Sequence, residues 1–103
     1  MNPALKGYLD PLILAVLADG SLHGYAVIEE LKARSGGELD LPEGTVYPAL
    51  HRLEHRGLLR SGWTTAAGRR RRMYRLTASG RRELASRARE WRTFALVVDG
   101  VLP

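Results

Sequence analysis

The chain has 103 residues, which is enough for one small domain and leaves little core in which to build a deep catalytic cleft. It contains no cysteine, no signal-peptide pattern and no apolar run near the roughly 20 residues that cross a bilayer. Disulfides and thiolate metal sites are therefore excluded, and we expect a cytoplasmic protein with no membrane partner. Its net charge of +5 is unevenly distributed, because residues 1–50 carry three basic and seven acidic side chains whereas residues 51–92 carry thirteen and three. A localised positive face of this kind favours a polyanionic partner, nucleic acid first.

Apolar residues at helical spacing predict two short helices in the first third of the chain. The first follows a short tail, ends at Asp19-Gly20, and has one apolar face made of Leu9, Leu12, Ile13, Val16 and Leu17. After a turn over residues 21–24, the second helix has the apolar positions Val27, Ile28 and Leu31 and ends at Gly36-Gly37. His23 lies at the mouth of this helix, where we expect a structural bond to a neighbouring carbonyl.

A third helix is predicted to open at Pro42-Glu43, where a proline loses no hydrogen bond and a carboxylate favours the helix N-terminus. Its buried stripe consists of Val46, Ala49, Leu50 and Leu53. Gly57 is the expected left-handed terminator. Pro48 inside the helix removes the bond to the Gly44 carbonyl at a cost of about 3 kcal/mol, so we expect a bend there or a first turn that is not fully α-helical.

Residues 58–65 and 70–76 alternate as strands and are joined across residues 66–69, which predicts a β-hairpin. Trp63 and Tyr74 fall at period-two positions and are expected to pack against the helices rather than to stack on bases. Thr77 then caps a long final helix. Its apolar residues recur at alternating spacings of four and three, at Leu84, Ala88, Trp91, Ala95, Val98 and Leu102. A seam of this kind requires a partner helix, and we expect a homodimer with Leu84, Ala88, Trp91, Ala95 and Val98 at its interface.

Three helices followed by a hairpin and a final helix predict a mainly α fold with a small β-hairpin, namely a winged helix-turn-helix over residues 1–77 and a dimerisation helix over residues 78–103. With its stripe inward, the third helix presents polar groups outward: Thr45, Tyr47, Pro48, His51, Arg52 and His55. Arginine can bind guanine or phosphate, and proline offers an apolar surface to thymine methyls. The surface therefore suits a DNA groove.

Three segments in the same order carry a family resemblance: HGYAVIEEL at residues 23–31, GTVYPALHRLEHRGLL at 44–59 and RRRMYRLTASG at 70–80. Together they resemble the PadR family of transcriptional regulators, in its short form with one C-terminal helix. The resemblance implies a dimeric winged-helix repressor that binds a pseudo-palindromic operator on double-stranded DNA. It assigns DNA contacts to Tyr25, Thr45, Tyr47, Pro48, His51 and Arg52, and phosphate contacts to the wing arginines Arg69, Arg70, Arg71 and Arg72.

Several alternatives remain at this point. Some members of the family bind aromatic effectors, and Trp91 between the small Ala88 and Ala95 leaves space for a planar ligand shared by two subunits. His51 and His55 stand at i and i+4, but without a third ligand we expect neither a metal site nor a cofactor. The sequence contains neither a nucleophile-base pair nor a phosphate-binding glycine loop, so we do not expect an enzyme. The rival functions are a non-specific nucleic-acid binder and a basic adaptor for an acidic protein.

Overall fold

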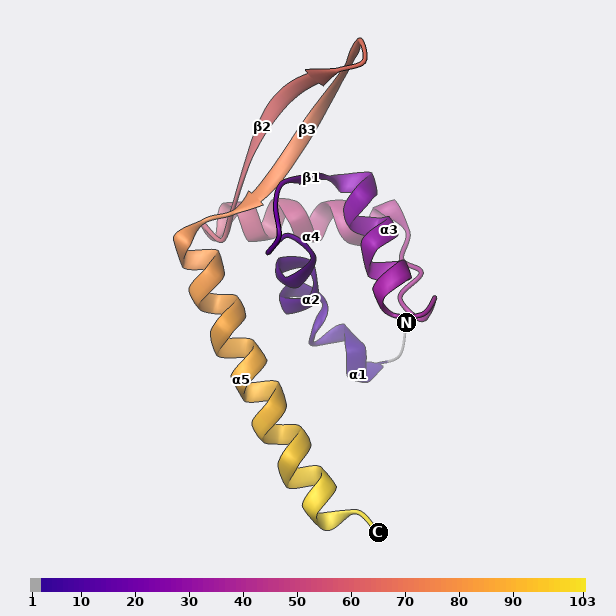
Figure 1. Ribbon diagram of the computed structural model, residues 1–103, viewed down its shortest axis with the longest axis vertical. Helices are drawn as coiled ribbons and strands as arrows, with labels where there is room; N and C mark the ends of the chain where they lie inside the picture. Colours follow the sequence, from indigo (N-terminus) through magenta and orange to yellow (C-terminus); the bar gives the residue numbers. More distant parts are fainter. Residues whose placement is uncertain (1–2) are drawn as a thin grey trace.

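The computed structural model describes residues 3–103, with the side chains from residue 5 onward, and Figure 1 shows its elements. They are, in chain order, α1 (Pro3–Lys6), α2 (Leu9–Val16), β1 (Leu22–His23), α3 (Gly24–Arg34), α4 (Glu43–His55), β2 (Leu59–Ala66), β3 (Arg69–Leu76) and α5 (Ala78–Val101). This confirms the predicted mainly α fold with a winged helix-turn-helix and a long final helix. Residues 1 and 2 of the predicted DNA-binding region lie outside the described residues.

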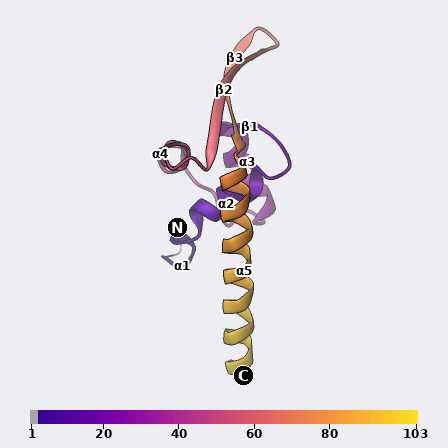
Figure 2. The same cartoon turned by 90° about the vertical axis from the view of Figure 1, so that its left-hand side faces the viewer.

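The molecule is elongated, with extents of 56 × 28 × 20 Å. The β2–β3 hairpin, which we call the wing, projects from one end of the helical body, and α5 extends from the other (Figures 1 and 2). Seen from the side in Figure 2, α4 lies on one flank of the body. None of the helices in residues 3–103 combines the length and apolar content that a bilayer span requires.

The sheet has a third strand that the sequence analysis did not predict. β1 pairs antiparallel with β3, with Leu22 opposite Tyr74 and His23 opposite Met73, so the strand order is β1-β3-β2. A strand of two residues is too short to show a period of two, and it forms only because β3 offers a free edge. Its effect is to fix the start of α3 against the base of the wing.

Helix α4 is held by its apolar stripe, as predicted. Val46, Ala49, Leu50 and Leu53 are all fully buried. Gly57 ends the helix with φ of +76°, which confirms its role as a left-handed terminator. The helix runs from Glu43 to His55 and contains Pro48. In its first turn the Thr45 amide donates to the Pro42 carbonyl at 3.0 Å, a 3₁₀-type bond, beside the α-helical bond from the Val46 amide at 3.2 Å, which agrees with the expected turn that is not fully α-helical. Gly44, whose carbonyl loses its partner to the proline, is exposed, and water can replace the missing bond.

Helix α5 is anchored at its first turn. The Thr77 side chain accepts a hydrogen bond from the Gly80 amide at 3.0 Å, which confirms the predicted cap. The same hydroxyl donates to the Gly57 carbonyl at 2.6 Å and so joins the end of α4 to the start of α5. The first half of α5 packs on α2, where Leu84 contacts the core. Leu84, which the sequence placed at the dimer interface, is thus already partly buried within one chain.

Candidate nucleic-acid interface

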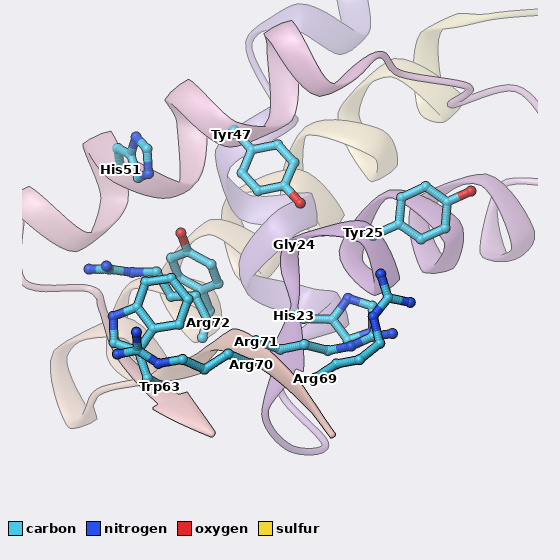
Figure 3. A pocket seen from close by; sticks show the side chains of 11 residues that line it. His23, Gly24, Tyr25, Tyr47, His51, Trp63, Arg69, Arg70, Arg71 and Arg72 are labelled. Carbon is cyan, nitrogen blue, oxygen red and sulfur yellow. The ribbon is translucent and has the colours of Figure 1, made fainter. Parts of the chain in front are cut away.

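The start of α3, one face of α4 and the inner side of the wing border a concave pocket with a volume of about 680 Å³ (Figure 3). We call it the wing pocket. Its lining is aromatic and basic: His23, Gly24, Tyr25, Tyr47, His51, Trp63, Arg69, Arg70, Arg71, Arg72 and Tyr74. None of these described lining residues is acidic. The pocket thus brings together, from three separate elements, Tyr25, Tyr47, His51 and all four wing arginines of the predicted contact set.

Tyr47 is positioned by a glycine on the neighbouring helix. The Tyr47 hydroxyl points toward Gly24 (Figure 3). A Cβ atom at Gly24 would lie 2.6–2.8 Å from the Tyr47 ring and hydroxyl, closer than real contacts allow. Gly24 therefore lets the half-buried Tyr47 ring approach α3 closely, while His51, one turn further along α4, lines the same pocket and stays exposed.

Two of the four wing arginines lie against a tryptophan. The guanidinium groups of Arg70 and Arg72 lie over the Trp63 ring, 4.6 Å and 5.6 Å from its centroid. Trp63 is 54% exposed, so the prediction that it packs against the helices is wrong, whereas Tyr74 is 1% exposed and packs in the core as predicted. The difference arises because the wing extends beyond the helical body, and the strand face that is buried at Tyr74 is open at Trp63.

Glu54 on α4 fixes the base of the wing, a role that the sequence analysis missed. Its carboxylate accepts hydrogen bonds from the Ser61 amide at 3.0 Å and the Ser61 hydroxyl at 2.6 Å, and it lies 3.6 Å from Arg72. The Ser61 hydroxyl also accepts from Arg72 Nε at 2.9 Å. The Ser61 hydroxyl is the main cause that lowers the pKa of Glu54, with the Ser61 amide and the Arg72 charge acting in the same direction. The signal available in the sequence was an acidic residue, Glu54, within the strongly basic segment of residues 51–92.

His23 has a structural role, as expected, but with a different partner. Its Nδ1 accepts a hydrogen bond from the Ala26 amide at 3.2 Å and so caps α3, whereas a bond to a carbonyl was expected. Its Nε2 lies 2.6 Å from Nη1 of Arg71. Burial and, second, the Arg71 charge lower the pKa of His23, which Glu29 only partly opposes. The imidazole is therefore neutral near pH 7.

The rest of the predicted contact set lies outside the wing pocket. Thr45, Pro48 and Arg52 do not line it. Arg52 is instead held by Asp10 of α2, with Nη2 2.7 Å from Oδ1. Within residues 3–103 no group of three or more His, Cys, Asp or Glu side chains is placed to share a metal ion. The predicted contact set is thus divided between the wing pocket and an outer α4 face, where Arg52 pairs with Asp10.

A second hollow, the α5 groove, lies where α5 meets α1 and α2. It has a volume of about 660 Å³ and a mostly apolar lining: Leu5, Tyr8, Pro11, Leu12, Ala15, Leu84, Arg87, Ala88, Trp91 and Phe94. Trp91 meets the edge of Tyr8 at 5.1 Å between ring centroids. The predicted seam is therefore divided. Leu84, Ala88 and Trp91 line this groove within one chain, whereas Ala95 and Val98 lie beyond it.

A helix with an exposed polar face, set beside a basic antiparallel wing on a small helical body, defines a winged-helix DNA-binding protein. The comparisons with known proteins name the family. The family model described as "Transcriptional regulator PadR-like family" matches residues 13–86, which is most of the chain. This protein therefore belongs to the PadR-like family of transcriptional regulators, and the resemblance stated from its sequence is confirmed.

Individual relatives match this chain over most of its length. The transcriptional regulator Rv3488 of Mycobacterium tuberculosis is 42% identical over 85% of this chain and 79% of its own. The structure of a PadR family transcription regulator from Clostridium difficile is 34% identical, with a TM-score of 0.83 over 94% of this chain and 100% of its own. A transcriptional regulator from Clostridium thermocellum superposes with a TM-score of 0.86 at 27% identity, over 97% of this chain and 98% of that one.

Proposed function

We propose that this protein is a homodimeric, cytoplasmic repressor that binds a pseudo-palindromic operator through the wing pocket and the exposed face of α4. The observation that supports this most directly is the wing pocket itself, where four arginines and the polar side chains of α4 face one open, acid-free concavity. A protein that used its arginines only as general charge would not need to order them. Here Trp63 lies against Arg70 and Arg72, and Glu54 pairs with Arg72.

In this proposal α4 enters the major groove and the wing follows the adjacent backbone. Tyr47, His51 and the outer residues Thr45 and Pro48 reach base edges, while Tyr25 and the arginines 69–72 contact phosphates. Arg52 joins them when it leaves Asp10. An exposed ion pair is worth roughly 1 kcal/mol or less, so a phosphate or a guanine can compete for this guanidinium.

The far half of α5 supplies the argument for a second copy. Beyond the α5 groove this end of the chain carries Leu96 and Val101, which are 73% and 81% exposed, along with Val97 and Leu102. A projecting helix with this much apolar surface is stabilised when a second α5 covers it. Two-fold pairing with Ala95 and Val98 at the contact places two α4 helices in successive major grooves, about 34 Å apart.

The α5 groove supports an effector site for a small aromatic compound. Its volume lies in the range of ligand pockets, and its lining is apolar with Trp91 and Tyr8 as stacking surfaces. A planar ligand that binds better to a dimer with wrongly spaced α4 helices releases the operator. Because the chain has two tryptophans, Trp63→Phe leaves Trp91 as the only indole, and its fluorescence reports ligands directly. If planar aromatic compounds leave that fluorescence unchanged, there is no effector site here.

Equilibrium binding to two DNA duplexes tests the proposed function. Fluorescence anisotropy at one salt concentration compares the promoter of the protein's own gene with a random duplex of equal length. We expect the promoter to bind at least 100-fold more tightly. Equal affinity for the two duplexes would establish the non-specific binder instead.

Tyr47→Ala separates the regulator from an adaptor for an acidic protein. It is expected to abolish promoter preference while sedimentation still shows a dimer. Arg89→Ala, on the exposed side of α5, is the matched control and is expected to leave preference unchanged. Full promoter binding by Tyr47→Ala would contradict the proposed recognition surface.

A further inference from the structure

His23 faces two hydrogen-bond donors with room for only one. Its Nδ1 lies 3.2 Å from the Ala26 amide nitrogen, and its Nε2 lies 2.6 Å from Nη1 of Arg71. A neutral imidazole has one lone pair and one N–H, and arginine has donors only. If Nδ1 accepts from Ala26, then Nε2 carries its hydrogen toward the guanidinium. The capping bond and the arginine contact cannot both be hydrogen bonds.

Two donors, Nε2 of His23 and Nη1 of Arg71, therefore face each other without an acceptor between them. An anionic oxygen near Nε2 and Nη1 would accept from both groups at once and leave the Nδ1 cap intact. The neighbours favour an anion further, because Arg69 and Arg70 precede Arg71 on the same strand and line the same pocket. Figure 3 shows His23 lying beside Arg71 at the α3 side of the wing pocket.

We infer that His23 and Arg71 together form a binding site for one phosphate group of the DNA backbone. His23 donates from Nε2 and Arg71 from its guanidinium, while the Ala26 amide holds the ring in the tautomer that makes this possible. The inference rests on the proposed function, since it places a particular phosphate where β1, α3 and the wing meet. The inference also explains a role for β1, because the pairing of β1 with β3 brings His23 beside Arg71.

Two variants remove the site without removing the fold. His23→Asn keeps an oxygen that caps α3, because asparagine is among the best N-cap residues, but it has no group that reaches the Nε2 position. Arg71→Gln removes the charge on the other side. His51→Asn is the control, since it removes another imidazole from the same pocket while Arg71 lies 2.6 Å from His23.

DNA with single methylphosphonate linkages identifies the phosphate. Each neutral linkage removes one charge, and the promoter duplex is scanned position by position by fluorescence anisotropy. For the unaltered protein we expect one position in each half-site to weaken binding by roughly tenfold or more, the size of a lost charge-assisted hydrogen bond. His23→Asn is expected to lose a similar factor on normal DNA and to lose nothing further at that position, whereas His51→Asn remains sensitive there.

Each contrary result has a clear meaning. If His23→Asn loses as much as the unaltered protein at every methylphosphonate position, His23 does not bind backbone phosphate and the inference is wrong. If inorganic phosphate at constant ionic strength weakens DNA binding by the unaltered protein but not by His23→Asn, and no methylphosphonate position is silenced, the site takes free phosphate instead. If the unaltered protein does not prefer its promoter at all, it is the proposed function that fails, and this result is obtained before any variant is tested.

Discussion

The packing of Tyr47 on Gly24 predicts that a single methyl group weakens DNA recognition. In Gly24→Ala the new Cβ lies 2.6–2.8 Å from the Tyr47 ring, where ordinary carbon contacts begin near 3.5 Å, so the ring must move by about 1 Å. Crowding of this kind costs about 1–3 kcal/mol, and replacing glycine by alanine in a helix returns up to about 1 kcal/mol. We therefore expect a net loss of about 1 kcal/mol in the free energy of unfolding. Promoter affinity falls more sharply, by about tenfold or more, because the displaced Tyr47 no longer faces the groove.

A double-mutant cycle separates this mechanism from a general loss of stability. In a Tyr47→Ala background the clash is absent, so Gly24→Ala is expected to be neutral or stabilising, which gives a coupling of about 1–3 kcal/mol between the two positions. Urea denaturation followed by circular dichroism measures all four proteins. Gly100→Ala, with nothing within 4 Å of its new Cβ, is the matched control and is expected to raise stability slightly. Additive effects of Gly24→Ala and Tyr47→Ala would refute the reasoning.

Four further variants test other parts of the structure. Trp63→Leu removes the ring beneath two arginines and is expected to weaken promoter binding about three- to tenfold with little change in melting temperature, as measured by anisotropy and calorimetry; unchanged affinity would show that the ring does not order them. Glu54→Gln concerns acid stability. The folded-state pKa of Glu54 is lowered, so the carboxylate stabilises the fold above its unfolded pKa, near about 4.3, and this stabilisation is lost as pH falls through the folded-state pKa. The variant is therefore expected to lose less stability than the natural chain between about pH 5 and pH 3. Identical urea midpoints of the two proteins over that range would contradict this. Asp10→Asn frees Arg52, and also removes the 3.8 Å contact of Arg56 with the same carboxylate. It is expected to tighten binding to random duplex and to steepen its salt dependence by about one or two phosphate contacts, whereas an unchanged salt slope means that neither arginine reaches DNA. Val98→Glu places a charge on the far half of α5 and is expected to yield monomers in sedimentation equilibrium, a result that an undisturbed dimer would rule out.

Features that depend on residues close together in the chain could be predicted from sequence. The buried stripe of α4, its left-handed end at Gly57 and the Thr77 cap each follow from spacing or from a backbone preference at one position. The same is true of the outward direction of His51. Local signals of this kind determined the order of the elements and hence the class of fold.

Features that depend on where one element ends against another could not be predicted in this way. Period two places Trp63 and Tyr74 on one face of the wing, but it does not say where the helical body stops covering that face. The pairing of Arg52 with Asp10 joins residues far apart in the chain, as does the contact of His23 with Arg71. The sequence predicted most of the residues that line the wing pocket, and the structure shows which of the predicted contacts share that pocket and which are held elsewhere.

Hydroxyl-radical footprinting on the DNA upstream of the protein's own gene tests the central claim most directly. A dimer that reads an operator through two α4 helices predicts a bounded site with two symmetric sets of protected positions, about 10 base pairs apart from centre to centre. The same reaction with Tyr47→Ala is expected to lose both sets together. Protection that spreads without boundaries, and equally on random DNA, would contradict the account and leave the wing arginines as a non-specific grip on phosphate.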